Sequence, residues 1–143
     1  MHNRTCTVVK EVVSNVSGQE VVFQHGGSEE DSDVLGGMEQ TIDPDDRHTA
    51  DSVQLYNFTT TTVTEVLSSH KAPMSIDFLS IDVEGAEEVV LQGFDLDKFC
   101  VRFATIEHNG MEPLRSNLRE AFESYGHKYG GTEAFDDYYV KDC

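Results

Sequence analysis

The pattern of apolar and polar positions is clearest between residues 76 and 93. Residues 76–81 are mostly apolar on both alternating faces, which is typical of a strand covered on both sides in a parallel sheet flanked by helices. Residues 86–90 repeat their apolar positions at the spacing of a helix with one buried side, and Gly93 marks its expected end. Gly85 lets the backbone turn closely between the two. The pattern therefore predicts a strand, a tight turn and a helix.

Further elements are expected on both sides of this unit. A second buried strand is predicted at residues 101–106, about one right-handed strand, helix, strand interval later. An apolar stripe then predicts a helix over residues 114–125. Short extended pieces at 127–129 and 138–141 flank Gly130-Gly131 and predict a hairpin, which makes that edge of the sheet antiparallel.

The N-terminal part has weaker patterns. Residues 5–13 and 19–24 are rich in β-branched residues and predict a hairpin-like pair of strands. Residues 53–66 are expected to be extended, with a helical turn that begins near Val63. From residue 25 to residue 52 the periodicity is lost and Gly, Ser and Asp predominate, which predicts a flexible surface loop. Such a long loop is either disordered, the favoured interpretation, or a lid that shapes substrate choice.

Composition limits the class of protein and its partners. The chain has 143 residues, of which 38% are hydrophobic, so a single domain with its own core is expected. It has 10 Lys and Arg against 27 Asp and Glu, a formal charge of −17 that repels polyanions. We therefore expect no nucleic-acid partner. We also expect no membrane segment, because no apolar run approaches the ~20 residues that span a bilayer.

Cysteines and asparagines bear on the compartment. The three cysteines are far apart in the sequence: Cys6, Cys100 and Cys143. Without a Cys-x-x-Cys pair they predict neither a zinc site nor a disulfide framework, and Cys100 is expected to be a small buried residue. Three asparagines, Asn3, Asn15 and Asn57, stand in Asn-x-Ser/Thr sequons that permit glycosylation on a secretory route. The compartment thus stays open between the cytoplasm and a secretory lumen.

Polar residues follow both central strands. They are Asp82 and Glu84 after the first strand, and Glu107 and His108 after the second. Ligands of open α/β sheets bind beyond the carboxyl ends of the strands, so we expect these four side chains to converge on one crevice. Capping of free amides at a helix start is the competing explanation for Asp82 and Glu84, and the whole expected role of Glu87.

The same stretch carries a family resemblance. Residues 75–94, SIDFLSIDVEGAEEVVLQGF, closely resemble the signature of FkbM-type methyltransferases, which depend on S-adenosylmethionine and mostly methylate oxygen. Ile-Glu-His-Asn at 106–109 fits as well, and the resemblance extends more weakly over residues 5–140. It implies an α/β fold, a partial Rossmann-like class I methyltransferase sheet that is mostly parallel with an antiparallel C-terminal hairpin.

The resemblance also implies roles for the four polar residues. Asp82 would lie near the methionine end of S-adenosylmethionine. Glu84 and Glu107 would position the acceptor hydroxyl, and His108 would be the base that removes its proton. The acceptor is expected to be a small-molecule or glycan hydroxyl, and no metal is expected.

The cofactor side of the domain is incomplete in this sequence. Val13 and Ser14 resemble the end of the strand that lines the adenine, but no strand leads through a glycine-rich turn onto a helix. The family carries that loop upstream, so residues 1–143 resemble a single truncated domain with an incomplete S-adenosylmethionine pocket. We expect, in this order, a fragment of a longer enzyme, a half supplied by another chain, or a loss of catalysis.

Two other functions are alternatives. The first is a non-catalytic interaction domain with the methyltransferase fold, which would not bind the cofactor. The second is a metal-dependent nuclease, because Asp82-x-Glu84 after a buried strand resembles the first motif of two-metal exonucleases. Against it, His127 and Asp136 are too far apart for the remaining motif, and the acidic surface disfavours nucleic acid.

Overall fold

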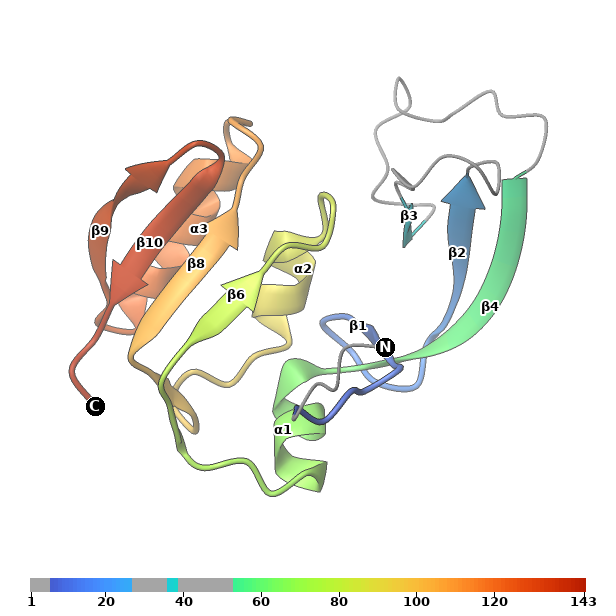
Figure 1. Cartoon of the computed structure of the whole chain (residues 1–143), viewed down its shortest axis with the longest axis horizontal. Helices are drawn as coiled ribbons and strands as arrows, with labels where there is room; N and C mark the ends of the chain where they lie inside the picture. The colour runs from blue at the N-terminus through green and yellow to red at the C-terminus, as the bar shows by residue number, and fades with distance from the viewer. Residues whose placement is uncertain (1–5, 27–35, 39–52) are drawn as a thin grey trace.

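The computed structural model describes residues 6–26, 36–38 and 53–143 and has a mixed α/β architecture (Figure 1). The elements in chain order are β1 (Val12–Val13), β2 (Glu20–Gly26), β3 (Gly36–Met38), β4 (Val53–Thr61), α1 (Val63–Ser69), β5 (Ser75–Ile76), β6 (Leu79–Ile81), α2 (Glu87–Gln92), β7 (Cys100–Val101), β8 (Phe103–Glu107), α3 (Leu114–Ser124), β9 (Lys128–Glu133) and β10 (Asp136–Val140). The helices and strands expected after residue 53 are therefore present with small shifts in their ends, except that the strands expected at 76–81 and 101–106 are each divided into two.

The central sheet has the strand order β6-β8-β10-β9. β6 runs parallel to β8 with Ile81 opposite Ile106, and β10 runs antiparallel to β8 with Asp137 opposite Ile106. The predicted C-terminal hairpin is confirmed, although Gly130 and Gly131 lie inside β9 and not in the turn. Among the described strands, β6 forms an edge of this sheet.

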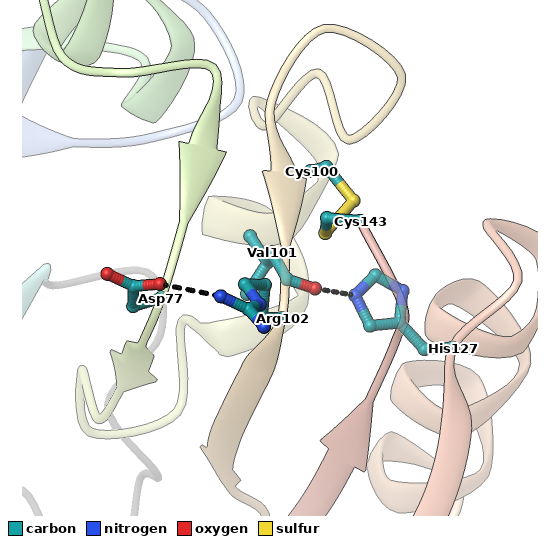
Figure 2. Close-up of a disulfide and its surroundings, with 6 residues drawn as sticks. All are labelled: Asp77, Cys100, Val101, Arg102, His127 and Cys143. Carbon is teal, nitrogen blue, oxygen red and sulfur yellow. Dashed lines mark hydrogen bonds and ion pairs between the residues drawn. A yellow bond between two sulfur atoms is a disulfide. The ribbon is translucent and has the colours of Figure 1, made fainter.

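The strand expected at residues 76–81 is interrupted. β5 pairs in parallel with β7, while β6 pairs with β8, and Asp77 and Phe78 separate the two pieces. Asp77 forms an exposed ion pair with Arg102 at the same level of the neighbouring strand, with 3.3 Å between Oδ1 and Nη1 (Figure 2).

The core lies on one face of the central sheet, where α2 and α3 pack together behind the strands (Figure 1). Its largest members are aromatic. The ring of Phe122 on α3 stacks on Tyr139 of β10 with 4.6 Å between centroids, and both side chains are fully buried. Phe99 and Phe94 extend the core beneath α2, with ring centroids 6.3 Å apart. Stacked aromatic pairs of this kind add to the free energy gained from area burial.

The opposite face of the sheet is not covered by the described residues. The side chains of Phe78, Phe103 and Tyr138 form a ladder across neighbouring strands, with centroids 5.8 and 5.9 Å apart. Phe78 is 57% exposed. The expectation that this strand is covered on both sides is therefore wrong for the described part of the chain, because both helices that pack on the sheet lie on the same side.

The N-terminal strands form a second sheet with the order β1-β4-β2-β3. β1 pairs in parallel with β4, and β2 pairs antiparallel with β4, so the expected hairpin between the first two strands is wrong. The two long strands form a ribbon that extends away from the central sheet (Figure 1). Of the expected loop at 25–52, residues 25–26 end β2 and 36–38 form β3, and the rest lies outside the described residues.

The expectation of a mostly parallel sheet needs correction as well. Three strand pairs are parallel, β1 with β4, β5 with β7 and β6 with β8, and all of them are short. The longer pairings of the ribbon and of the C-terminal hairpin are antiparallel. β9 and β10 are joined directly by residues 134–135, a short connection that is possible only between antiparallel strands. No helix in the described ranges is both long and apolar enough to cross a membrane.

A disulfide joins Cys100 to Cys143, with 5.9 Å between their Cα atoms (Figure 2). The cysteine spacing predicted no disulfide framework, so this bridge corrects that expectation. Val140 lies opposite Phe103, and the amide of Lys141 donates to the carbonyl of Arg102 at 3.0 Å. Continued by two residues, this antiparallel register brings position 143 opposite position 100. Sequence spacing alone contains no information on register, which is why the pair could not be predicted.

Asp137 connects the C-terminal hairpin to α3. It is only 1% exposed and accepts hydrogen bonds from Arg115, Arg119 and Thr132, including 3.0 Å contacts from both guanidinium groups. Burial alone would raise the pKa of Asp137, but these hydrogen bonds outweigh it and lower the pKa to about 2. The charge is therefore compensated inside the fold.

Asp137→Asn is expected to destabilise the fold by about 3 kcal/mol, the lower end for a broken buried ion pair because both arginines reach solvent. The stabilisation by Asp137 is present above its ordinary pKa and is lost as the pH falls towards about 2. Urea unfolding at pH 7 measures the change. Asp136→Asn, one residue earlier on the same strand, is the control, and equal losses in both variants would contradict the assignment.

Gly93 ends α2 and allows the N-terminal segment to approach it. A Cβ atom at this position would lie 2.3 Å from the carbonyl oxygen of Ser14 and 3.0 Å from Cα of Asn15. The helix does end where predicted, but with Gly93 at φ −86°, so close approach and not a left-handed conformation requires the glycine.

Gly93→Ala is expected to destabilise the fold by roughly 1–3 kcal/mol, because the backbone of β1 must move away from α2. Thermal unfolding followed by circular dichroism measures this. Gly130→Ala is the matched control, since its Cβ would make only ordinary contacts, the nearest at 3.5 Å to the carbonyl of Tyr138. A loss of stability at position 130 equal to that at position 93 would contradict the explanation.

Candidate functional site

The two parallel strands of the central sheet end in similar turns. After β6, Glu84 and Gly85 have φ angles of 54° and 94°, and after β8, Asn109 and Gly110 have φ angles of 49° and 68°. A non-glycine residue in this region is energetically unfavourable and is often found at functional sites. Each strand thus ends in a sharp reversal that presents its polar residues at the carboxyl edge of the sheet.

Glu87 holds the turn after β6. It is fully buried at the first position of α2, and its Oε1 atom accepts hydrogen bonds from the amides of Val83 at 3.0 Å and Gly85 at 3.1 Å. The expectation that Glu87 only caps the start of a helix is therefore too narrow, because it binds amides of the preceding turn. Its Oε2 atom receives no hydrogen bond from the described residues.

Glu107 lies beside Asp82 at the end of the neighbouring strand. Burial raises the pKa of Glu107 most, followed by the charge of Asp82 and a hydrogen bond with it, and then by the charges of Glu84 and Glu87, to about 7. A hydrogen bond between two carboxyl groups requires one proton, because ionised carboxylates have no donor. The parallel register explains the contact, since Ile81 lies opposite Ile106 and the next residues are Asp82 and Glu107.

This arrangement can hold and release a proton near neutral pH. A carboxyl group with a pKa of about 7 is half ionised at physiological pH, which suits a general acid or base. The Oε2 atom of Glu107 is buried, and no described N–H or neutral hydroxyl donates to it. A carboxyl group with a raised pKa beside further acids at a strand end is a feature expected of a reaction centre.

His108 lies on the other face of the sheet. Its ring is 3% exposed, its Nδ1 atom accepts from the amide of Gly110 at 2.9 Å, and its Nε2 atom is 3.4 Å from Oδ1 of Asp137. The expectation that His108 faces Asp82 is therefore wrong. Consecutive strand residues point to opposite faces, so Glu107 and His108 cannot share one crevice while the chain stays extended.

Val13 and Ser14 are not brought to the acidic residues either. Val13 ends β1 in the N-terminal sheet. Ser14 follows it, is 4% exposed, and its amide donates to the carbonyl of Thr61 at 2.8 Å. The carbonyl of Ser14 packs against Gly93 at the C-terminal end of α2. The turn that Glu87 holds lies at the other end of this helix. Of the predicted site residues, the structure thus gathers Asp82, Glu84 and Glu107, and their roles stay predictions.

Sequence reasoning missed the importance of two acids. Glu87 shares one helix face with Val90 and Leu91, and an acid within a buried stripe was a signal of a special role. Asp137 alternates with buried Tyr139 on β10, which placed it on the core face. The importance of both residues was recognised only from their burial in the structure.

In the ranges 6–26, 36–38 and 53–143 no group of three or more His, Cys, Asp or Glu side chains could hold a metal ion. The nuclease alternative therefore gains no observation in its favour. A positively charged ligand suits the edge better, because the described ion pairs engage Asp77 and Asp137 and not the acids of this site.

Comparison with known families identifies the class of protein. The family model of the methyltransferase FkbM domain matches residues 6–129, and the chain belongs to this family. Comparisons with curated proteins and with solved structures gave no significant match. The acidic residues at the carboxyl edge of the central sheet therefore belong to a methyltransferase domain.

The raised pKa of Glu107 predicts how stability changes with pH. The folded state holds this proton up to about pH 7, whereas the unfolded chain releases it near 4.5, so stability falls as the pH rises between these values. Glu107→Gln removes the titrating group and with it this fall in stability. The melting temperature of the variant relative to wild type is therefore expected to rise from pH 5 to pH 8.

Differential scanning fluorimetry over this range measures the effect. Glu120→Gln makes the same chemical change on the exposed surface of α3 and serves as the control. If the difference between Glu107→Gln and wild type stays constant over this range, the proton is not held in the folded protein.

Proposed function

We propose that this chain provides the acceptor side of an S-adenosylmethionine-dependent O-methyltransferase with a Rossmann-like class I sheet. The reaction transfers a methyl group to a small-molecule or glycan hydroxyl. The observation that carries the proposal is the pairing of Glu107 with Asp82 at the carboxyl ends of adjacent parallel strands, with the pKa of Glu107 raised to about 7.

Glu107 is the proposed base. Removal of the hydroxyl proton makes the oxygen a better nucleophile, and a base is most effective when its pKa lies near the working pH. Glu107 meets this condition because burial and the nearby acids disfavour its charge. In its ionised form it accepts the proton at a carboxylate oxygen. This role replaces the one expected for His108, whose ring lies on the other face.

Asp82 and Glu84 have supporting roles. Asp82 contacts Glu107 and would hold the cofactor near its methionine end, where a carboxylate suits the positive charges of the sulfonium and the ammonium group. When bound, S-adenosylmethionine supplies an activated methyl group on that positively charged sulfur. Glu84, held in a left-handed conformation beside Gly85, would accept a hydrogen bond from the acceptor and orient its hydroxyl group.

The pocket needs further residues for the rest of the cofactor. β6 has a described neighbour on one side only, β8, and the face with Phe78, Phe103 and Tyr138 is uncovered by the described helices. We place the strand and glycine-rich turn that complete the pocket along this free edge. An additional strand there would satisfy the backbone groups of β6, and a helix after it would cover the aromatic ladder.

The test uses the enzyme with its glycine-rich cofactor loop. Glu107→Gln is expected to lower turnover by at least ~100-fold, the usual contribution of a general base, and to remove the rise of the rate near pH 7. His108→Gln is expected to lower the melting temperature and leave the shape of the pH–rate profile unchanged. Glu120→Gln is the control for both measurements.

Titration calorimetry with S-adenosylhomocysteine separates the alternatives. Binding to wild type and to Glu107→Gln with similar affinity, together with lost turnover in the variant, supports the assignment. No binding to the complete domain would favour the non-catalytic interaction domain. Normal turnover of Glu107→Gln at pH 7 would remove this residue from the chemistry.

A further inference from the structure

The disulfide between Cys100 and Cys143 points to an oxidising compartment. Disulfides persist in secreted proteins and in the lumen of the secretory route, whereas cytosolic thiols are kept reduced. The two cysteines are 43 positions apart, and the ladder between β8 and β10 aligns them (Figure 2). The bridge therefore belongs to the regular pairing of the sheet and is not a chance contact of a loose tail.

A second, independent feature points to the same compartment. Asn57, Phe58 and Thr59 form an Asn-x-Thr sequon, the acceptor sequence for N-linked glycans. Asn57 lies in the middle of β4, opposite Val22 of β2, and its side chain and that of Thr59 are exposed. The β2–β4 ribbon extends away from the central sheet (Figure 1).

The sequon at Asn15 is less suitable in the folded chain. Its amide nitrogen donates to Oε1 of Gln92 at 3.3 Å, and its backbone packs against Gly93. The hydroxyl of Ser17 donates a hydrogen bond to the carboxylate of Glu65. A glycan on Asn15 would therefore disturb the contact between β1 and the end of α2, whereas a glycan on Asn57 extends into solvent.

We propose that this protein matures in the secretory route and carries an N-linked glycan on Asn57. The donor is a lipid-linked oligosaccharyl diphosphate. A bond forms between Nδ2 of Asn57 and the anomeric carbon, the bond from that carbon to the diphosphate oxygen breaks, and the lipid diphosphate leaves while Nδ2 loses one proton. Cys100 and Cys143 are oxidised to their disulfide by thiol–disulfide exchange with an oxidised dithiol protein of the same compartment, which takes up their two electrons and two protons.

The experiment uses the natural full-length protein, produced in eukaryotic cells without an added leader. Peptide N-glycosidase is expected to increase its electrophoretic mobility and to convert Asn57 to Asp in the tryptic peptide. Asn57→Gln and Thr59→Ala are expected to abolish the mobility change. Thr59→Ser preserves the sequon and is expected to retain it, which separates glycosylation from any effect on folding.

Thiol labelling tests the compartment on the same samples. A maleimide polymer is expected to label only Cys6 before reduction, and Cys100 and Cys143 as well after it. Wild type without a mobility change, or with one that persists in Asn57→Gln, would overturn the glycan assignment. Labelling of all three cysteines before reduction would overturn the oxidising compartment.

Discussion

The parallel pairing of β6 with β8 determines what lies at the edge of the central sheet. With Ile81 opposite Ile106, the residues that follow are carried past the ends of their strands at the same level. A shift by one residue would turn Glu107 towards α3 and bring His108 to the open face. The hydrophobic core prevents such a shift, because Ala104 and Ile106 of β8 would both leave it. The packing of apolar side chains on one face thus determines which polar side chains lie on the other.

Several acids can lie together there because only part of their charge exists at once. Glu87 places one oxygen against two amides, and Glu107 takes up a proton in response to its neighbours. On the opposite face, the charge of Asp137 is compensated by two arginines. The proton of Glu107 can be exchanged near neutral pH, whereas Asp137 stays ionised there.

The sequence predicted the local elements and the acidic edge because both depend on short-range patterns. The buried stripe of residues 114–125, the helix end at Gly93 and the polar residues after each strand could all be read from spacing. Pairing between distant segments could not, which explains the wrong N-terminal hairpin and the missed bridge of Cys100 to Cys143. The face of His108 was predictable in principle, since alternation alone excludes it from the side of Glu107.

The left-handed backbone at Glu84 places two demands on one residue. A glycine would adopt φ 54° freely, and an asparagine would tolerate it better than a glutamate does. Engineering for heat resistance would therefore select this position early, yet either replacement removes the carboxylate to which we assign the orientation of the acceptor. Under that proposal thermostability and function compete at this single position, so a stabilised variant of this domain should be screened for retained turnover before it is adopted.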